Sequence, residues 1–355
     1  MSHLAQLQRT LDAVDETYCV QPIGTDMVIL VTQRGGRVLG IFPDPAAPNL
    51  LWVNSALADA SSFGTFISRG DWNLGGERIW IAPEIQYNVR DREDFWGTLA
   101  VPARMDPGDY LLSTEQNRVH LRATMGLTAH VLASGIKTLY VRRTIQPVAN
   151  PLRSLAVCDE LMRDVAFGGY EQSVHLTDTN DTEIVSEAWN LVQLPAGGTL
   201  IIPCSTAVEG SDYFGTPVPE LRNPSAGALR IPITGRQQYK VGYKAPCMTG
   251  RMGYLNQLEG DRCSLLVRHF HNQLNNLYAE EPPHQPGNNG HSVHVYNDGG
   301  EFGGANAFGE MECTGTTIGG GTGRREAFDT FSMYVFVGTK ARLAHIAEYL
   351  LGVAL

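Results

Sequence analysis

Two glutamates near the C-terminus, Glu310 and Glu312, have the residue type and spacing that acid–base chemistry needs. They belong to GEMEC (309–313), which follows a glycine-rich turn. If this segment is a β-strand, both glutamates face one way, while Met311 and Cys313 face the packed core. The carboxylates are then roughly 6.6 to 7 Å apart. That spacing suits a sugar-sized pocket with one acid or base and one hydroxyl acceptor, although Glu-x-Glu strands also occur on solvent-facing sheets.

A second polar and aromatic segment, residues 68–91, contains Arg78 and Trp80 after a Gly-Gly turn. On a strand the two side chains share a face. A guanidinium can donate to several sugar oxygens, and an indole offers a flat apolar surface to C–H groups. The alternative is a surface Arg–Glu pair beside a core tryptophan. Glu84, after Pro83, is a further carboxylate at a strand end, and its alternative is a solvated loop acid.

A third segment, residues 171–181, contains His175 between Val174 and Leu176. A strand histidine that opens onto a cleft is a good general-acid candidate, because its ordinary pKa is near ~6.5. A structural role is the alternative. The glutamate segment itself is preceded by HSVHVYND, which places three more polar side chains on one face of their strand: His294, Tyr296 and Asp298.

The elements that position these side chains are β-strands. The sequence contains many short runs with period-two alternation that are rich in β-branched and aromatic residues. So many strands without long helical segments between them exclude a parallel α/β sheet and predict an all-β protein, a large antiparallel two-sheet β-sandwich. The candidate strands are MVILVT (27–32), RVLGIF (37–42), LLWVN (50–54), RIWIA (78–82), VHLRATM (119–125), LYVRRTIQPV (139–148), SLAVCDEL (154–161), GTLIIPC (198–204), ALRIPI (228–233), CSLLVRHF (263–270), HSVHVYN (291–297), GEMEC (309–313) and FSMYVFVG (331–338).

Apolar residues at helical spacing predict short helices at the two ends of the chain, over residues 2–14 and 340–352. The intervening strands predict a single domain over residues 1–355, because all-β domains of this size routinely fold as one unit. The net charge of −10, without a basic block, argues against a nucleic-acid partner.

Scattered cysteines and the absence of a long apolar segment bear on compartment and ligands. The six cysteines form no CxxC pair or zinc-type spacing, so we expect free thiols, no metal and no cofactor. The sequence has no signal-peptide pattern and no stretch of about 20 apolar residues. We therefore expect a cytoplasmic protein without a membrane partner, whose ligand is a small sugar. Its oligomeric state is left open.

The order of these motifs resembles the galactose mutarotase (aldose 1-epimerase) superfamily, whose fold is a two-sheet β-supersandwich. The resemblance rests on GGERIWIAPE, the mid-chain histidine and HVYNDGG…FGEMECTG, and extends from about residue 27 to residue 338. It implies that Glu312 is the base that takes the anomeric hydroxyl proton. It also implies that His175 protonates the ring oxygen and that Arg78 contacts the sugar. The second histidine usual in that family is missing from DFWGTLAVPARMD.

Three functions are compatible with these residues. The resemblance favours an isomerase of the aldose 1-epimerase type, with Arg78, Trp80, Glu310, His294, Tyr296 and Asp298 as substrate-binding residues. A glycoside-cleaving enzyme would use a carboxylate pair, Glu310 with Glu312 or Glu312 with Glu84. A non-catalytic sugar-binding module would stack sugars on its aromatic side chains, among them Trp80, Trp96, Trp189 and Tyr296.

Overall fold

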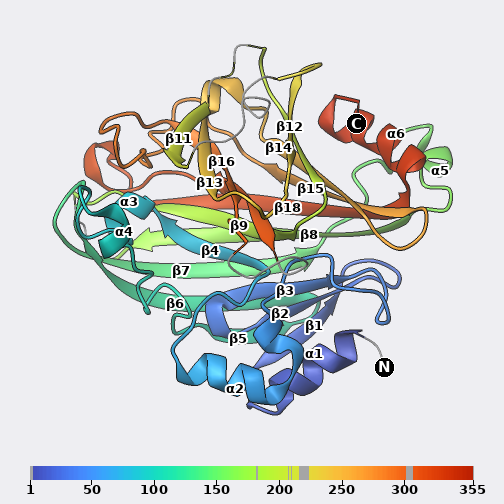
Figure 1. Cartoon of the computed structure of the whole chain (residues 1–355), viewed down its shortest axis with the longest axis horizontal. Helices are drawn as coiled ribbons and strands as arrows, with labels where there is room; N and C mark the ends of the chain where they lie inside the picture. Colours follow the sequence, from blue (N-terminus) through green and yellow to red (C-terminus); the bar gives the residue numbers. More distant parts are fainter. Residues whose placement is uncertain are drawn as a thin grey trace.

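Two antiparallel nine-stranded sheets form the framework of the protein (Figure 1). The computed structural model describes residues 3–180, 183–206, 208, 210–215, 224–300 and 307–354. The all-β sandwich predicted from the sequence is confirmed. Gly303 and Gly304, in the glycine-rich segment before Glu310 and Glu312, lie outside the described residues.

The first sheet, called sheet A here, contains all the strands that form the floor of the candidate site. Its order is β1-β2-β3-β4-β9-β17-β16-β13-β11, so β17 is a central strand between β9 and β16. The strands are β1 (Tyr18–Pro22), β2 (Val28–Thr32), β3 (Arg37–Phe42), β4 (Glu77–Ala82), β9 (Glu187–Pro195), β11 (Gly210–Phe214), β13 (Tyr239–Lys244), β16 (His291–Asn297) and β17 (Phe308–Thr314).

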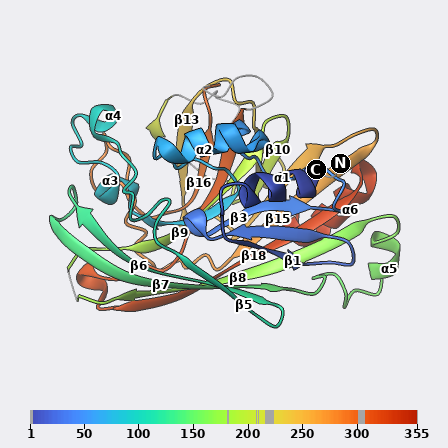
Figure 2. The same cartoon turned by 90° about the horizontal axis from the view of Figure 1, so that it is seen from below.

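The second sheet, called sheet B, has the order β12-β10-β14-β15-β18-β8-β7-β6-β5. It contains the longest strands, and they run beneath sheet A in Figure 2. The strands are β5 (Leu111–Glu115), β6 (Arg118–Ala129), β7 (Gly135–Pro147), β8 (Ala166–Asp178), β10 (Thr199–Pro203), β12 (Ala228–Pro232), β14 (Arg251–Gln257), β15 (Arg262–Phe270) and β18 (Glu326–Thr339).

The core lies between the two sheets because alternate side chains of each strand point inward. In β17 the inward side chains are Met311 and Cys313, and both are fully buried, as the sequence pattern predicts. The core also contains a polar network around Glu77 of β4, whose Oε1 accepts hydrogen bonds from Gln172 (3.0 Å) and Asn190 (2.7 Å). The Arg268 guanidinium lies 2.6 Å from the same oxygen, so this buried carboxylate ties sheet A to sheet B.

Helices cover the outer faces of the sandwich. The apolar side of α1 and the two phenylalanines of α2 pack on the outward side chains of β2 and β3, so both helices lie on sheet A (Figure 2). In the same way, α6 packs on β14, β15 and β18 of sheet B. The helices are α1 (His3–Asp12), α2 (Ala60–Ser68), α3 (Glu84–Tyr87), α4 (Phe95–Thr98), α5 (Cys158–Leu161) and α6 (Lys340–Leu351), and the 3₁₀ turns are Arg34–Gly36, Ser55–Ala58, Ala245–Cys247 and Gly320–Thr322.

The terminal helices form where the apolar spacing predicts them, but two of the candidate strands are wrong. Residues 50–54 make only an isolated bridge at Val53, and residues 154–161 form turns and α5. Both segments are apolar enough for a strand, but residues 50–54 make isolated backbone hydrogen bonds, such as those to Ile41 and Gln193, and no continuous ladder with the described strands. The sequence pattern also missed α2, as well as β1, β5, β9, β11, β13 and β14.

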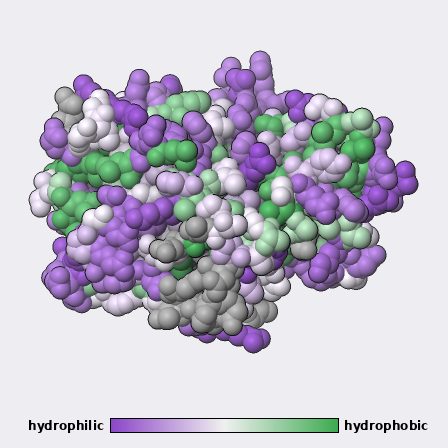
Figure 3. All heavy atoms as spheres, turned by 90° about the horizontal axis from the view of Figure 1, so that it is seen from above, coloured by the Kyte–Doolittle hydropathy of each residue, from purple (hydrophilic) through white to green (hydrophobic). Residues whose placement is uncertain are grey.

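Hydrophilic side chains cover most of the face that is seen from above in Figure 3, and hydrophobic atoms gather in separate patches toward its two ends. Within the described part of the chain, no helix has the length and apolar character needed to cross a membrane.

Candidate functional site

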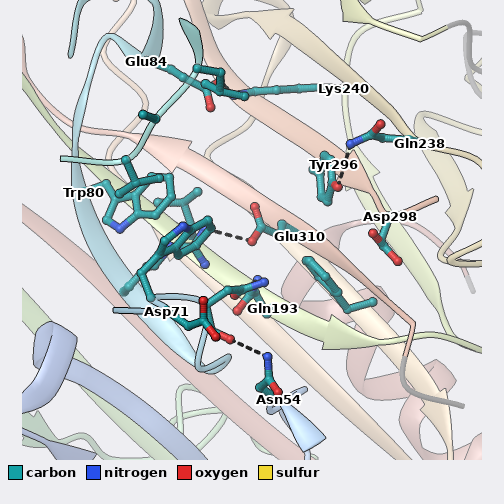
Figure 4. Close-up of a pocket in the computed structure, with 18 of the residues that line it drawn as sticks. Asn54, Asp71, Trp80, Glu84, Gln193, Gln238, Lys240, Tyr296, Asp298 and Glu310 are labelled. Atoms are coloured by element: carbon teal, nitrogen blue, oxygen red, sulfur yellow. Dashed lines mark hydrogen bonds and ion pairs between the residues drawn. The ribbon is translucent and has the colours of Figure 1, made fainter. Parts of the chain in front are cut away.

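A cleft of about 900 Å³ opens on the outer face of sheet A, beside α2 and the loop that contains α4. Figure 4 shows Glu310 near its centre, Glu84 and Lys240 at one end, and Asn54 and Asp71 at the other. This volume is at the upper end of the range for small-molecule sites, about 300 to 1,000 Å³. The floor consists of outward side chains from five neighbouring strands: Arg78, Trp80, Trp189, Leu191, Gln193, Glu310, Glu312, Tyr296 and Lys240.

The turn before β4 sets the position of the first floor residues. Gly75 and Gly76 have φ values of +98° and +75°, which favour glycine. A Cβ on Gly75 would lie 2.4 Å from the Trp52 carbonyl oxygen, so the close chain crossing also needs glycine. The strand that follows places Arg78 and Trp80 on the cleft side, with the guanidinium carbon 4.1 Å from the indole centroid.

A buried ion pair holds this tryptophan in place. The Trp80 indole Nε1 donates to Asp106 Oδ2 over 2.9 Å, and the same carboxylate is paired with the buried Arg37 guanidinium. Arg37 also donates to the carbonyl oxygens of Gly75 (2.8 Å) and Trp72 (3.0 Å). These contacts fix the Trp80 indole and the backbone at Trp72. The rings of both residues flank Arg78, whose guanidinium carbon lies 5.6 Å from the Trp72 ring centroid.

The two glutamates of β17 face the cleft side by side, but their surroundings differ. Glu310 Oε1 accepts a hydrogen bond from Arg78 over 3.0 Å, in a buried ion pair. Glu312 is fully buried, and its Oε2 accepts a hydrogen bond from the Trp189 indole over 3.1 Å. The surface Arg–Glu pair considered from the sequence is therefore a buried pair that lines a cleft.

A buried lysine stands next to Glu312. Lys240 Nζ donates to Glu84 Oε2 over 2.7 Å and lies 3.7 Å from Glu312 Oε2. It also lies 4.2 Å from the centroid of the Trp189 ring, a cation–π contact. Glu280 is joined to this group, because its Oε2 accepts a hydrogen bond from the Glu84 backbone nitrogen.

This environment shifts the protonation of Glu312. Burial raises the pKa of its carboxyl from 4.5 to about 8, with Lys240 opposing the rise and Glu310 adding to it. Burial therefore favours the neutral form of the Glu312 carboxyl, whereas Glu310 is ion-paired with the Arg78 guanidinium. Two neighbouring carboxyls in such unlike surroundings form a pattern typical of acid–base sites.

Several buried polar atoms of the cleft have no hydrogen-bond partner among the residues that the structure describes. They are Glu312 Oε1, Gln193 Oε1, and Nε and Nη1 of Arg78. Leaving such atoms unpaired is costly, typically ~1–3 kcal/mol each, more for charged groups. A ligand with many hydroxyl groups would supply both the donors and the acceptors that they lack.

Tyr296 and Asp298 line the cleft on the side opposite Asp71 (Figure 4). The Tyr296 hydroxyl accepts a hydrogen bond from Gln238 Nε2 over 3.2 Å. Asp298 Oδ2 accepts one from the Gly300 backbone nitrogen over 2.9 Å. Both residues therefore present oxygen atoms at the cleft wall.

His294 pairs with Glu312 across β16 and β17, but its ring is buried beside the cleft and does not line it. Its Nε2 shares a hydrogen bond with the Tyr213 hydroxyl over 3.1 Å, and that hydroxyl also contacts His291 Nδ1 over 3.1 Å. Burial holds the pKa of His294 well below its ordinary value. A neutral His294 supports the site from the adjacent strand.

The structure does not bring His175 to the cleft. It lies on β8 of sheet B, where its neighbours Val174 and Leu176 point into the core. The ring therefore points outward from the far sheet and contacts Arg142 (2.6 Å) and Glu326 (3.1 Å). Both layers of the sandwich separate it from Glu312, so the expected meeting of His175 with Glu312 and Arg78 is not found.

Sequence reasoning missed Lys240, Gln193 and Asp106. Lys240 lies in YKVGYK, whose alternation of apolar and polar residues is a strand signal that was overlooked. Gln193 belongs to β9, another unrecognised strand. Asp106 carries no local signal, because its role depends on a tertiary contact. Within the described residues, His, Cys, Asp and Glu side chains form no group of three or more that could hold a metal ion.

The acids around Lys240 predict how stability depends on pH. Burial also raises the pKa of Glu280 to about 8. A carboxyl with a raised folded-state pKa favours folding below its unfolded pKa, and this contribution is lost as the pH rises through the folded value. We expect the free energy of unfolding to fall from about pH 4.5 to about pH 8. Glu280→Gln should flatten that profile by on the order of 1 kcal/mol per pH unit, measured by urea unfolding.

The control for this measurement is Glu259→Gln, because Glu259 is exposed and should leave the slope unchanged. Parallel profiles for the wild type and Glu280→Gln would contradict the assignment of a buried, protonated Glu280.

The comparisons with known proteins concern nearly the whole chain. The model of a family described as a family of unknown function (DUF6786) matches residues 6–355. No curated protein matches the sequence. Among solved structures, a candidate aldose 1-epimerase from Escherichia coli K12 is 12% identical, with a TM-score of 0.49 and coverage of 90% of this chain and 99% of that one. A galactose mutarotase-like protein from Lactobacillus casei ATCC 334 is 11% identical, with a TM-score of 0.49 and coverage of 90% and 100%.

Proposed function

Because this chain belongs to the family of unknown function DUF6786, we propose its function from the side chains of the cleft: it binds an aldose and interconverts its anomers by acid–base catalysis. The observation that carries the proposal is the pair of unlike carboxyls on β17. Glu312 is buried with a raised pKa and one unpartnered oxygen, and Glu310 is ion-paired with Arg78.

The walls of the cleft suit a sugar. Indole rings at Trp72 and Trp80 offer apolar faces, and Tyr296 and Phe308 lie opposite with ring centroids 5.7 Å apart. Three polar atoms of the cleft have no hydrogen-bond partner among the described residues: Gln193 Oε1, and Nε and Nη1 of Arg78. A sugar ring has apolar C–H faces and a rim of hydroxyls, and therefore satisfies both kinds of surface.

The two carboxyls supply the proton transfers that ring opening requires. Glu310 takes the proton of the anomeric hydroxyl while Glu312 gives its proton to the ring oxygen. The bond between C1 and the ring oxygen breaks, and the C1 carbonyl forms. After rotation about the C1–C2 bond, the reverse transfers close the ring as the other anomer. This assignment makes Glu312 the acid at the start of the cycle, and it then acts as the base during closure.

The test is to measure anomer interconversion by proton NMR or polarimetry with freshly dissolved aldoses. A panel of glucose, galactose, mannose and xylose covers the common ring configurations. The proposal expects at least one of them to equilibrate faster with the wild type than with the Glu312→Gln variant. Equal rates for both proteins across the panel would overturn it.

His175 provides a discriminating variant, because the resemblance to the mutarotases assigned it the acid role. Since it lies on the outer face of sheet B, we expect His175→Gln to retain kcat and KM within about twofold of the wild type. The same NMR assay measures both constants. A loss comparable to that of Glu312→Gln would show that the two side chains meet in solution and would contradict the placement described above.

Glycoside cleavage by the same carboxyls is less well supported. Inverting hydrolysis needs the acid and the base on opposite faces of the sugar, whereas Glu310 and Glu312 project from one face of one strand. Release of reducing ends from oligosaccharides would favour it over anomer interconversion.

We also propose that the protein is cytoplasmic. All six cysteines lie among the described residues and are free thiols, which suits the reducing cytoplasm.

A further inference from the structure

A second, smaller cavity of about 290 Å³ adjoins the cleft, and its lining shares Trp96 and Phe214 with it. Trp96 belongs to α4, in the loop after β4, and Phe214 ends the edge strand β11. The cleft itself is already larger than a single sugar ring needs. The space beyond the two rings therefore extends a site that one monosaccharide does not fill.

Trp96 is the most exposed aromatic side chain of this region, with 56% of its surface accessible. Its neighbours Phe95 and Phe214 contact it in edge-on fashion, each with ring centroids 5.0 Å away. Part of the indole therefore stays open to solvent at the junction of the two cavities. An exposed indole that is supported by other rings is a suitable platform for the C–H face of a sugar.

The loop that carries this indole is held in place. Asp94 Oδ1 accepts a hydrogen bond from the Gly97 backbone nitrogen over 3.2 Å, and the Thr98 hydroxyl donates to the Asp94 carbonyl over 2.8 Å. Arg92 pairs with Glu281 and so joins the loop to the segment that forms the opposite wall. A platform that is ordered before binding loses little entropy when a ligand arrives.

The rim of the smaller cavity is polar and charged. Arg92, Glu93 and His284 line it together with the aromatic rings. A purely apolar ligand would leave these groups desolvated at a cost, whereas a second sugar ring places its hydroxyls against them and its C–H face on Trp96.

We propose that the substrate is a reducing oligosaccharide of two or more sugar rings, with its reducing-end ring over Glu310 and Glu312 and the next ring on Trp96. This inference rests on the proposed function for the identity of the reducing-end position. The second ring lies on the face that Trp96 and Phe214 form at the junction of the two cavities. This face is called the Trp96 shelf.

The experiment compares each disaccharide with its own reducing-end monosaccharide: maltose and cellobiose with glucose, mannobiose with mannose, and xylobiose with xylose. Binding is measured by isothermal titration calorimetry, and turnover by NMR. We expect at least one disaccharide to bind about tenfold more tightly than its monosaccharide. Trp96→Ala should remove most of that gain, and Trp96→Phe should restore part of it.

Tyr349→Ala is the matched control, because Tyr349 is also a half-exposed aromatic residue but lies on α6 over sheet B. Thermal unfolding confirms that each variant is folded. The inference is overturned if no disaccharide binds more tightly than its monosaccharide, or if Trp96→Ala weakens both equally. Disaccharide binding that depends on Trp96 without any turnover would leave this inference standing and overturn the proposed activity. Turnover of monosaccharides without tighter binding of any disaccharide would support the proposed activity and overturn this inference.

Discussion

Replacing Glu312 by glutamine lowers kcat for anomer interconversion by about 100-fold or more, because a positioned proton-transfer group contributes ~10²- to 10⁴-fold. The amide keeps the size of the side chain and can still accept the hydrogen bond from the Trp189 indole. It also resembles the neutral carboxyl that burial favours at this position. The variant should therefore fold and bind sugar, and lose the acidic proton.

The Glu310→Gln variant tests the role of the second carboxyl. It removes the base that takes the anomeric proton and also the charge that pairs with Arg78, so we expect kcat to fall by about 100-fold or more and KM to rise. The NMR assay gives kcat and KM for both variants, and calorimetry gives their sugar affinity. Retention of full kcat by Glu312→Gln would rule out its role in proton transfer. Retention of full kcat by Glu310→Gln would rule out Glu310 as the base.

Removing the Lys240 ammonium destabilises the folded chain. Lys240→Met leaves Glu84 and its neighbours without the cation that they surround, since the ammonium lies 2.7 Å from Glu84 and 3.7 Å from Glu312. Breaking a buried pair by deleting one partner typically costs ~3–5 kcal/mol. We expect a loss of this size in the free energy of unfolding, measured by urea denaturation at neutral pH.

Two further variants identify the cause of that loss. Lys340→Met removes an exposed lysine at the start of α6 and should change stability by less than about 0.5 kcal/mol. The double variant Glu84→Gln/Lys240→Met should recover part of the stability, because the unpaired carboxylate is removed as well. A loss below about 1 kcal/mol for Lys240→Met would mean that its charge is not buried in solution.

The sequence predicts those parts of the fold that local patterns encode. Alternation in GEMEC placed Met311 and Cys313 in the core, and the apolar spacing of the two ends gave α1 and α6. It misassigned residues 50–54 and 154–161, because apolar content alone does not show whether a segment forms a continuous hydrogen-bonded ladder with a neighbouring strand. Which strands become neighbours is a tertiary property that period-two alternation does not encode.

The same limit applies to the site. Alternation was enough to put Arg78 beside Trp80, and Glu310 beside Glu312, on the same faces of their strands. It could not show that β8 lies in the other sheet, so His175 looked equivalent to residues of sheet A. Nor could it show Lys240, whose effect on Glu312 depends on the pairing of β13 with β16 and of β16 with β17.

The position of Glu310 and Glu312 on a central strand limits the sequence changes that the cleft can tolerate. β17 is hydrogen-bonded on both sides, by β9 and β16, so an insertion there would turn both glutamates toward the core. Trp96 and Phe214 instead sit on a surface loop and at the end of an edge strand, where insertions are tolerated. In the proposed site the proton-transfer residues and the contact to the second ring therefore lie on separate segments, so a change in the Trp96 loop would alter ligand choice and leave β17 in place.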